Sequence, residues 1–244
     1  VGNMDLVFYD FETTGKEPHW DQILQVGATK VSKEFHEIDT FELRSRLKPG
    51  LIPSPFALSV NNTDYTKLIE TDCSHYEMLR KMEDKFTKWS PSIFVGYNSI
   101  SFDEEFLRNS LFRALLDPYL TSKNNNNRAD LLELLRTVDF FFPDTINVPI
   151  IKKNKKTFKL DQIAPANSIT HLAHDAFGDV IATKQLAQLI SKRKPTFWQS
   201  FLEGSNKSLV YKVLSEEKIV FSCQTFYGKT TAISGTFLLN HPVY

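Results

Sequence analysis

Residues 5–15, DLVFYDFETTG, are the stretch that decides the fold. Their apolar, β-branched and aromatic side chains predict a buried strand over residues 5–12. Because side chains alternate between the faces of a strand, Asp10 and Glu12 project from the same side. Two neighbouring carboxylates repel each other unless a cation lies between them, and a hard divalent cation takes oxygen ligands. The alternative is that both acids merely enter a turn at Thr-Thr-Gly.

The composition is that of an ordinary globular protein. The 244 residues are 41% hydrophobic and 24% charged, which suits one large domain or slightly more. Since 29 basic residues balance 29 acidic ones, a polyanion must be held by a local groove. Only two cysteines are present, which favours a reducing compartment. No apolar run approaches the roughly 20 residues of a membrane span and no signal peptide precedes Met4, so we expect a cytoplasmic protein.

The order of the predicted elements indicates an α/β fold with a mixed sheet. Strands are expected at 23–31, 40–47 and 93–97, and helices at 74–89, 103–116, 129–138 and 175–190. The helix at 74–89 opens on the capping box of Ser74 and Glu77. The asparagine run at 124–127 is expected to be an exposed loop, and the basic residues at 152–156 a solvated turn. Residues 192–195 (KRKP) indicate a boundary, so we predict one domain over 4–192 and a linker with a partial β-rich segment over 193–244.

Two further segments carry candidate site residues. In GYNSISFD, residues 96–103, a buried strand ends and Asp103 opens a helix, where an acid is often only an N-cap. In HDAFGD, residues 174–179, His174 precedes a helix and Asp179 lies on its first turns. A lone histidine at such a position is more often a capping or packing residue than a catalyst.

Taken together, the three segments contain what two-metal phosphodiester hydrolysis requires. In that reaction two divalent ions, about 3.5–4 Å apart, hold the attacking and leaving oxygens. Carboxylates suit Mg²⁺, and a histidine can accept a proton from water near neutral pH. The sequence contains no zinc-type Cys/His spacing, no nucleophile elbow and no phosphate-binding glycine loop.

The motifs DFETTG, GYNSISFD and HDAFGD, in this order and spacing, resemble those of the DEDDh 3′→5′ exonuclease superfamily. GYN-x-x-x-FD-x-E, DPY at 117–119, R-x-DLL at 128–132 and FKL at 158–160 are similar to the bacterial exonuclease I family. The resemblance covers Leu6 to about Lys192, and residues 193–244 resemble only the start of that family's SH3-like domain. It implies a ribonuclease-H-like mixed sheet flanked by helices, and 3′→5′ degradation of single-stranded DNA to mononucleotides. We expect a monomer that meets single-stranded DNA and a single-strand-binding protein.

The resemblance also implies residue roles. Asp10, Glu12 and Asp179 would hold the first of two Mg²⁺ ions, and Asp10 with Asp103 the second; Mn²⁺ can substitute. His174 would be the general base. Basic side chains neutralise phosphates and aromatic ones stack on unpaired bases, although Tyr119 and Phe158 could instead belong to the core. The full implied set of substrate contacts is Glu12, Arg108, Tyr119, Arg136, Phe158, Lys159 and His174.

The sequence departs from the family at two places that concern the substrate. Lys159 stands where the family has arginine. The substitution replaces a bidentate phosphate contact by a single point charge. Residues 121–127 are rich in asparagine where the family has stacking aromatics. Three rival hypotheses stay open: an RNA-trimming or proofreading exonuclease of the same superfamily, an inactive binding module on the same fold, and an interaction scaffold that docks through the residues after Lys192.

Overall fold

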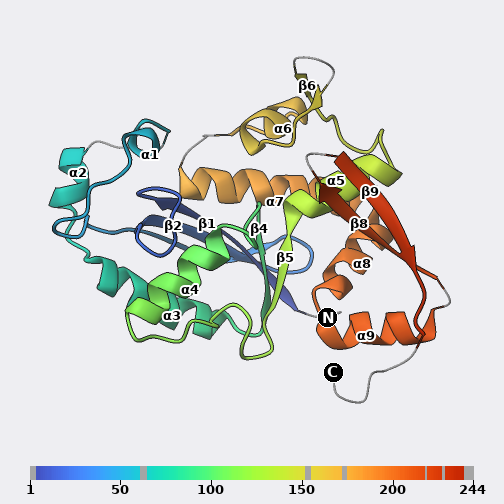
Figure 1. The fold of residues 1–244 in the computed structure, drawn as a ribbon, viewed down its shortest axis with the longest axis horizontal. Helices are drawn as coiled ribbons and strands as arrows, with labels where there is room; N and C mark the ends of the chain where they lie inside the picture. Colours follow the sequence, from blue (N-terminus) through green and yellow to red (C-terminus); the bar gives the residue numbers. More distant parts are fainter. Residues whose placement is uncertain are drawn as a thin grey trace.

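The main sheet has five strands in the order β3–β2–β1–β4–β5 (Figure 1). The computed structural model describes residues 4–60, 65–151, 155–171, 175–217, 219–226 and 229–238. β1 pairs antiparallel with β2, which pairs antiparallel with β3, whereas β1–β4 and β4–β5 are parallel. The predicted mixed sheet is therefore confirmed. Its strands are β1 (Asp5–Thr13), β2 (Ile23–Val31), β3 (Glu37–Arg44), β4 (Ser92–Gly96) and β5 (Asn127–Asp130).

Helices cover both faces of this sheet because β1 is apolar on both sides. Val7, Tyr9 and Phe11 face α3 (His75–Trp89) and α4 (Asp103–Arg113). Leu6 and Phe8 belong to the opposite core. That core is closed by α5 (Leu131–Phe141), α6 (Leu160–Ala166), α7 (Ala176–Arg193) and α8 (Pro195–Gly204). Any polar side chain that alternates with Tyr9 and Phe11 must therefore point toward the α7 side.

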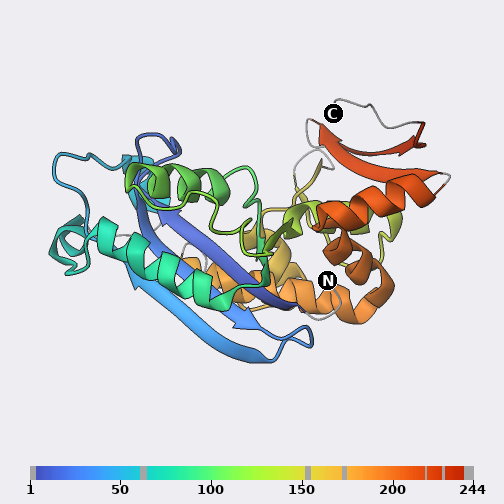
Figure 2. The ribbon, with the colours of Figure 1, turned by 90° about the horizontal axis from the view of Figure 1, so that it is seen from below.

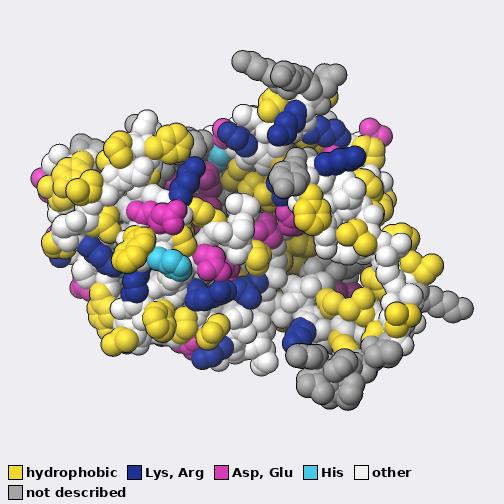
Figure 3. Space-filling view, viewed as in Figure 1, with side chains coloured by type: hydrophobic (Ala, Val, Ile, Leu, Met, Phe, Trp, Pro, Cys, Tyr) yellow, Lys and Arg dark blue, Asp and Glu magenta, His cyan; other side chains and the backbone are white. Residues whose placement is uncertain are grey.

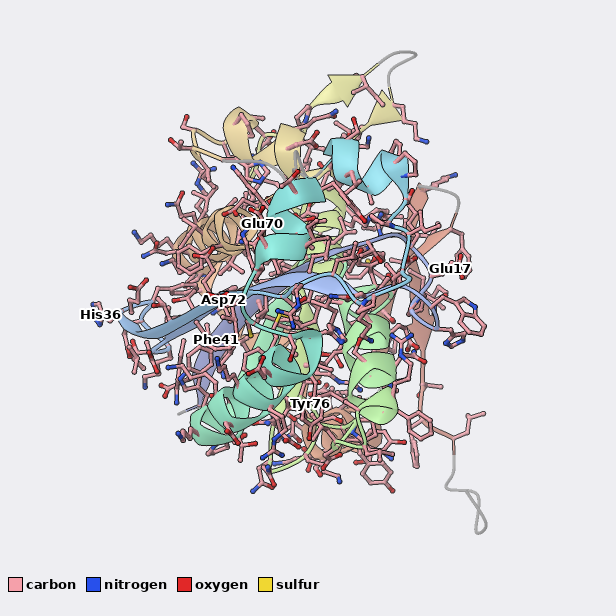
Figure 4. The ribbon with its side chains drawn as sticks, turned by 90° about the vertical axis from the view of Figure 1, so that its left-hand side faces the viewer. Glu17, His36, Phe41, Glu70, Asp72 and Tyr76 are labelled. Atoms are coloured by element: carbon pink, nitrogen blue, oxygen red, sulfur yellow. The ribbon has the colours of Figure 1, made fainter. Side chains whose placement is uncertain are left out.

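Smaller elements lie around this body. The helices α1 (Pro55–Val60) and α2 (Tyr65–Glu70) lie at one end of the molecule, and α9 (Lys207–Glu216) with the hairpin β8 (Val220–Phe226) and β9 (Lys229–Gly235) lies at the other (Figure 2). The short strands β6 (Ile150–Ile151) and β7 (Lys155–Lys156) form a second hairpin. Figure 4 places His36, in the turn between β2 and β3, at the margin of the molecule. Among the helices described, none is both long and apolar enough to cross a bilayer.

Three helix ends differ from the predicted ones: α4 ends at Arg113 rather than at residue 116, α5 at Phe141 rather than at 138, and α7 at Arg193 rather than at 190. The capping box at Ser74 is confirmed, since its side chain accepts from the Glu77 N–H and the Glu77 side chain accepts from the Ser74 N–H. β3 ends at Arg44 rather than at residue 47. The helix expected from residue 129 begins at Leu131, because Asp130 is its N-cap and accepts from the Leu132 N–H at 3.0 Å. α1, α2 and α9 were not expected from the sequence.

The prediction of an exposed loop over residues 124–127 is wrong for residues 126 and 127. Asn127 begins β5, and Asn126 is only 5% exposed. The Asn126 amide accepts from the Ser92 N–H at 3.0 Å and donates to the Ser90 hydroxyl at 2.9 Å and the Leu120 carbonyl at 3.0 Å. A buried amide thus replaces the backbone partners that are missing where two parallel strands begin. Part of the predicted basic turn also pairs as a strand at Lys155–Lys156, and residues 152–154 lie outside the described part.

Candidate active site

Asp10 and Glu12 lie on the part of β1 that extends beyond its parallel neighbour. The pairing of β1 with β4 ends at Phe8 opposite Val95, whereas the pairing with β2 continues past Asp10 and Glu12. Both carboxylates therefore stand at the end of the sheet and point toward α7. Figure 3 shows acidic side chains in the hollow at the middle of this face, with lysine and arginine side chains gathered above them.

Three carboxylates meet at this end of β1. One oxygen each of Asp10, Glu12 and Asp179 lies within 4.8 Å of the other two, and all three residues are partly buried. Asp179 is on the first turn of α7. Asp10 and Asp179 are some 170 positions apart in the sequence. The sequence predicts that they meet, and they do so because α7 packs on β1.

The electrostatics of this cluster fit a cation. Burial raises the pKa of Asp10 well above its usual value, and the charges of Asp103 and Asp179 raise it further. Burial and the charges of Asp179 and Asp175 raise the pKa of Glu12 to about 8, against a smaller lowering by Arg44. Neighbouring carboxylates repel each other when both are ionised, and a divalent ion bound between them offsets that repulsion. Oxygen donors at this spacing suit a hard ion such as Mg²⁺ or Mn²⁺.

Asp103 approaches β1 from the opposite face of the sheet. It is 3% exposed, and its Oδ1 accepts from the backbone N–H of Phe11 at 3.1 Å. Burial raises its pKa, and the hydrogen bond from Phe11 opposes that rise. The N-cap of α4 is Phe102, without a side-chain cap. Asp103 is therefore not a simple helix cap, although its carboxylate does not lie within 4.8 Å of all three acids of the cluster.

The start of α7 is fixed by contacts that the sequence did not reveal. Asp175 is the N-cap and accepts from the Gly178 N–H at 3.1 Å. The same carboxylate accepts from Arg44 at 2.8 Å and from the Gln25 amide at 2.9 Å. Gln25 is fully buried. β2 and β3 thus set the position of the helix that carries Asp179.

The histidine expected as the general base, His174, lies outside the described residues. His171 is described, and its Nε2 contacts Oδ1 of Asp179. Its side chain is almost completely buried. The only sequence signal for His171 is that it lies three residues before His174 in HLAH.

Of the seven residues predicted to contact substrate, Glu12 belongs to the carboxylate cluster and His174 lies outside the described residues. The other five fall into two groups. Arg136, Phe158 and Lys159 line one pocket of about 470 Å³, together with Tyr97, Lys155 and Lys156. Arg108 lies on α4 and pairs with Glu105 at 3.0 Å, and Tyr119 follows α4 and is 52% exposed. Tyr119 is therefore not a core residue. Phe158 is partly buried and packs against the core on the α7 side.

A second pocket, of about 490 Å³, adjoins Glu12. Phe11, Thr13, Gly15, Phe56 and Phe102 are among the residues that line it. The ammonium group of Lys16 lies 5.2 Å from the centre of the Phe56 ring at this pocket. A larger hollow between α5, α8 and β8 contains none of the clustered carboxylates.

Gly27 lets α7 reach the sheet beside Asp10. It pairs with Asp10 across β1 and β2, and a Cβ there would meet the backbone nitrogen of Phe177 at 2.6 Å and the carbonyl carbon of Ala176 at 2.7 Å. We expect Gly27→Ala to push the start of α7 away and lower kcat by about tenfold, because a displacement near 1 Å disrupts catalytic geometry. Steady-state kinetics of the hydrolysis that the sequence predicts would measure this change.

Gly204→Ala is the matched control, since a Cβ at Gly204 would meet no described atom within 4 Å beyond its chain neighbours and its own helix backbone. We expect it to keep kcat within twofold, a limit within which surface changes usually stay. If Gly27→Ala also kept kcat within twofold, the close approach of α7 to β2 would not be what positions Asp179.

A mixed sheet whose first strand and last long helix bring three carboxylates together offers a donor set of the kind that metal-assisted hydrolysis of phosphodiesters requires. The model of the exonuclease family matches residues 7–187, and the chain belongs to this family.

Several proteins similar to this chain confirm the resemblance seen in the three motifs. Exodeoxyribonuclease I of Buchnera aphidicola subsp. Baizongia pistaciae is 33% identical over 233 residues, which are 93% of this chain and 48% of that protein. Escherichia coli Exonuclease I in complex with a dT13 oligonucleotide matches with a TM-score of 0.87 and 26% identity, over 96% of this chain and 52% of that one. An ExoI/SSB-Ct complex matches with a TM-score of 0.85 and 25% identity, again over 96% and 52%. The chain spans about half the length of these relatives.

Proposed function

We propose that this chain is a metal-dependent 3′→5′ exonuclease that degrades single-stranded DNA to mononucleotides. The observation that carries the proposal is the meeting of the Asp10, Glu12 and Asp179 carboxylates within 4.8 Å at the end of β1. Membership of the exonuclease family and the similarity to exodeoxyribonucleases I support DNA as the substrate. All four metal-binding acids of the family pattern are present, which argues against an inactive binding module.

Four acids are the proposed ligands of the two ions. Asp10, Glu12 and Asp179 would hold one Mg²⁺ or Mn²⁺, and Asp10 with Asp103 a second. When bound, such ions stabilise the charge that develops on the attacking and leaving oxygens. The Phe11 N–H keeps the Asp103 carboxylate oriented toward β1, and Arg44 lowers the electrostatic cost of ionising Glu12.

We propose His174 as the residue that takes a proton from the attacking water, because its place before α7 matches the family motif. His171 contacts Asp179 and therefore has an orienting rather than a proton-accepting part in this scheme. The two histidines are three residues apart, so the two roles can be separated by substituting one at a time.

The pocket that contains Arg136, Phe158 and Lys159 is the proposed path of the strand. Basic side chains there neutralise phosphates, and the aromatic rings offer faces on which bases of any sequence stack. Lys156 is already paired with Asp139 at 2.7 Å, and Arg136 with Glu133 at 2.5 Å. Lys155 and Lys159 are therefore the basic side chains of this pocket that are better placed for phosphate. We propose that the terminal nucleotide occupies the pocket beside Glu12, where the rings of Phe56 and Phe102 offer stacking surfaces.

We also propose that the protein is a cytoplasmic monomer that meets a single-strand-binding protein. The support for this partner is the similarity to the ExoI/SSB-Ct complex. A balanced composition of 29 basic and 29 acidic residues is consistent with local rather than global attraction to DNA.

The proposed activity is tested by comparing oligonucleotides labelled at the 3′ end with others labelled at the 5′ end. We expect the 3′ label to be released at once as a mononucleotide, the 5′ label to stay on progressively shorter strands, and EDTA to abolish both reactions. A matched RNA should be degraded at least about tenfold more slowly, since a site can discriminate the 2′-hydroxyl. Internal cuts, or RNA degraded about tenfold faster, would contradict the proposal.

A further inference from the structure

A buried acid on α4 joins the two elements that carry Asp10 and Asp103. Glu104 is 4% exposed and accepts three hydrogen bonds. Its Oε1 accepts from the Tyr9 hydroxyl at 2.6 Å, and its Oε2 accepts from the Thr121 hydroxyl at 2.8 Å and from Arg128 Nη1 at 2.9 Å. The donors come from β1, from the loop after α4 and from β5. One carboxylate therefore ties three parts of the chain together behind the site.

The position of this network in the sequence connects it to the catalytic acids. Tyr9 directly precedes Asp10, and Glu104 directly follows Asp103. Tyr9 points into the α3–α4 core while Asp10 points to the other face, so the network holds β1 from the side opposite the carboxylate cluster. The hydrogen bond from the Phe11 N–H to Asp103 is a second tie between β1 and α4.

A buried ion pair is a costly way to stabilise a fold. Apolar side chains of similar volume often do as well, because the desolvation of two charges offsets much of their attraction. A fully hydrogen-bonded polar network does, however, favour one arrangement of its members over others. The Tyr9 hydroxyl is a neutral donor here, since burial and then the charges of Glu104 and Asp103 raise its pKa. Each accepting oxygen of Glu104 thus faces only donors.

We propose that Tyr9, Glu104 and Arg128 are positioning residues that hold the Asp103 carboxylate beside Asp10 for the second divalent ion. The inference rests on the metal-dependent reaction proposed above, but it concerns cation binding and not the nature of the nucleic acid. Groups that orient metal ligands from behind typically contribute about 10- to 100-fold to metal affinity or activity.

Tyr9→Phe tests the inference with the smallest change. It removes one hydroxyl and keeps the ring that packs near Phe11, Phe86 and Phe94. We expect the weaker of two Mn²⁺ sites, titrated by electron paramagnetic resonance without DNA, to lose about tenfold in affinity. The Mn²⁺ concentration for half-maximal rate should rise by about the same factor, while KM for the oligonucleotide stays within about twofold.

Two comparisons separate positioning from general stability. Asn126→Ala removes a buried amide with three hydrogen bonds where β4 and β5 begin, at the other end of these strands, so it should lower Tm without changing Mn²⁺ affinity. Arg128→Lys keeps a charged donor for Glu104 and should retain most of the Mn²⁺ affinity, whereas Arg128→Met should lose about tenfold.

A failure of this inference can be told apart from a failure of the proposed function. Unchanged Mn²⁺ affinity in both Tyr9→Phe and Arg128→Met, with a lower Tm, would make the network merely structural and overturn the inference. A wild-type protein that binds no Mn²⁺ would overturn it as well. If the wild type binds Mn²⁺ and Tyr9→Phe weakens that binding, the inference stands even where no strand is degraded, and only the proposed function fails. Should Tyr9→Phe not fold, the Arg128 pair decides.

Discussion

Asp10→Asn is expected to lower kcat on single-stranded DNA by roughly a thousandfold, or about 4 kcal/mol in activation free energy. Asp10 is the acid that both proposed metal positions share, and its oxygen lies within 4.8 Å of those of Glu12 and Asp179. An amide keeps the shape of the side chain but cannot supply a negative charge. Single-turnover kinetics with saturating Mn²⁺ would measure the loss.

The same variant should be more stable than the wild type when no metal is bound. Burial and the charges of Asp103 and Asp179 raise the pKa of Asp10, so the ionised carboxylate destabilises the folded protein at neutral pH. The neutral amide removes this repulsion. We expect Tm in EDTA to rise by a few degrees, as a change of about 1 kcal/mol would produce.

The control is Asp84→Asn, which removes an exposed acid on α3 and should alter neither kcat nor Tm. An Asp10→Asn protein that degrades oligonucleotides at the wild-type rate would contradict the metal mechanism. A lower Tm in EDTA would mean that Asp10 stabilises the apo fold, against the expected sign.

The part of the fold that the sequence predicts well is the part where local pattern and tertiary context agree. In β1 the alternation of Tyr9 and Phe11 with Asp10 and Glu12 assigns each side chain to a face, and the structure has the same assignment. Ser74 and Glu77 mark a helix start because a capping box satisfies backbone N–H groups without help from distant residues.

The errors occur where distant contacts override local preference. Asn126 belongs to a polar run typical of loops, yet three partners on other segments make its burial favourable. β5 is short because Asp130 caps the next helix, a boundary that composition alone does not reveal. α9 buries none of its residues completely, so its pattern carries little burial signal.

Only the residues that belong to the three sequence motifs could be predicted as members of the candidate site. Each acid lies where an element begins or ends, and the topology brings β1 and α7 together. The residues that hold those elements carry no motif. Arg44 and Gln25 come from β3 and β2 and meet Asp175 only in the folded chain. A single sequence does not show such pairings, because they depend on strand register and on the close approach of α7 at Gly27.

The unfolding temperature of the metal-free protein is expected to fall by several degrees between pH 5 and pH 8. The pKa of Glu12 is raised from its usual 4.5 to about 8 in the folded protein by burial and by Asp179 and Asp175. Above the usual value the unfolded chain releases this proton while the folded protein still holds it. The unfolded state then binds fewer protons, so the free energy of unfolding falls as pH rises through this window and levels off above it.

Glu12→Gln should flatten this dependence and be more stable than the wild type at pH 8 in EDTA. Glu70→Gln, at an exposed position on α2 (Figure 4), should keep the wild-type slope. Saturating Mn²⁺ should stabilise the wild type more at pH 8 than at pH 5, because the ion binds ionised carboxylates and competes with protons. Scanning calorimetry across this range measures all three effects. A metal-free wild type that grows more stable toward pH 8, with Glu12→Gln showing the same slope, would mean that Glu12 does not share a repulsive cluster with Asp179.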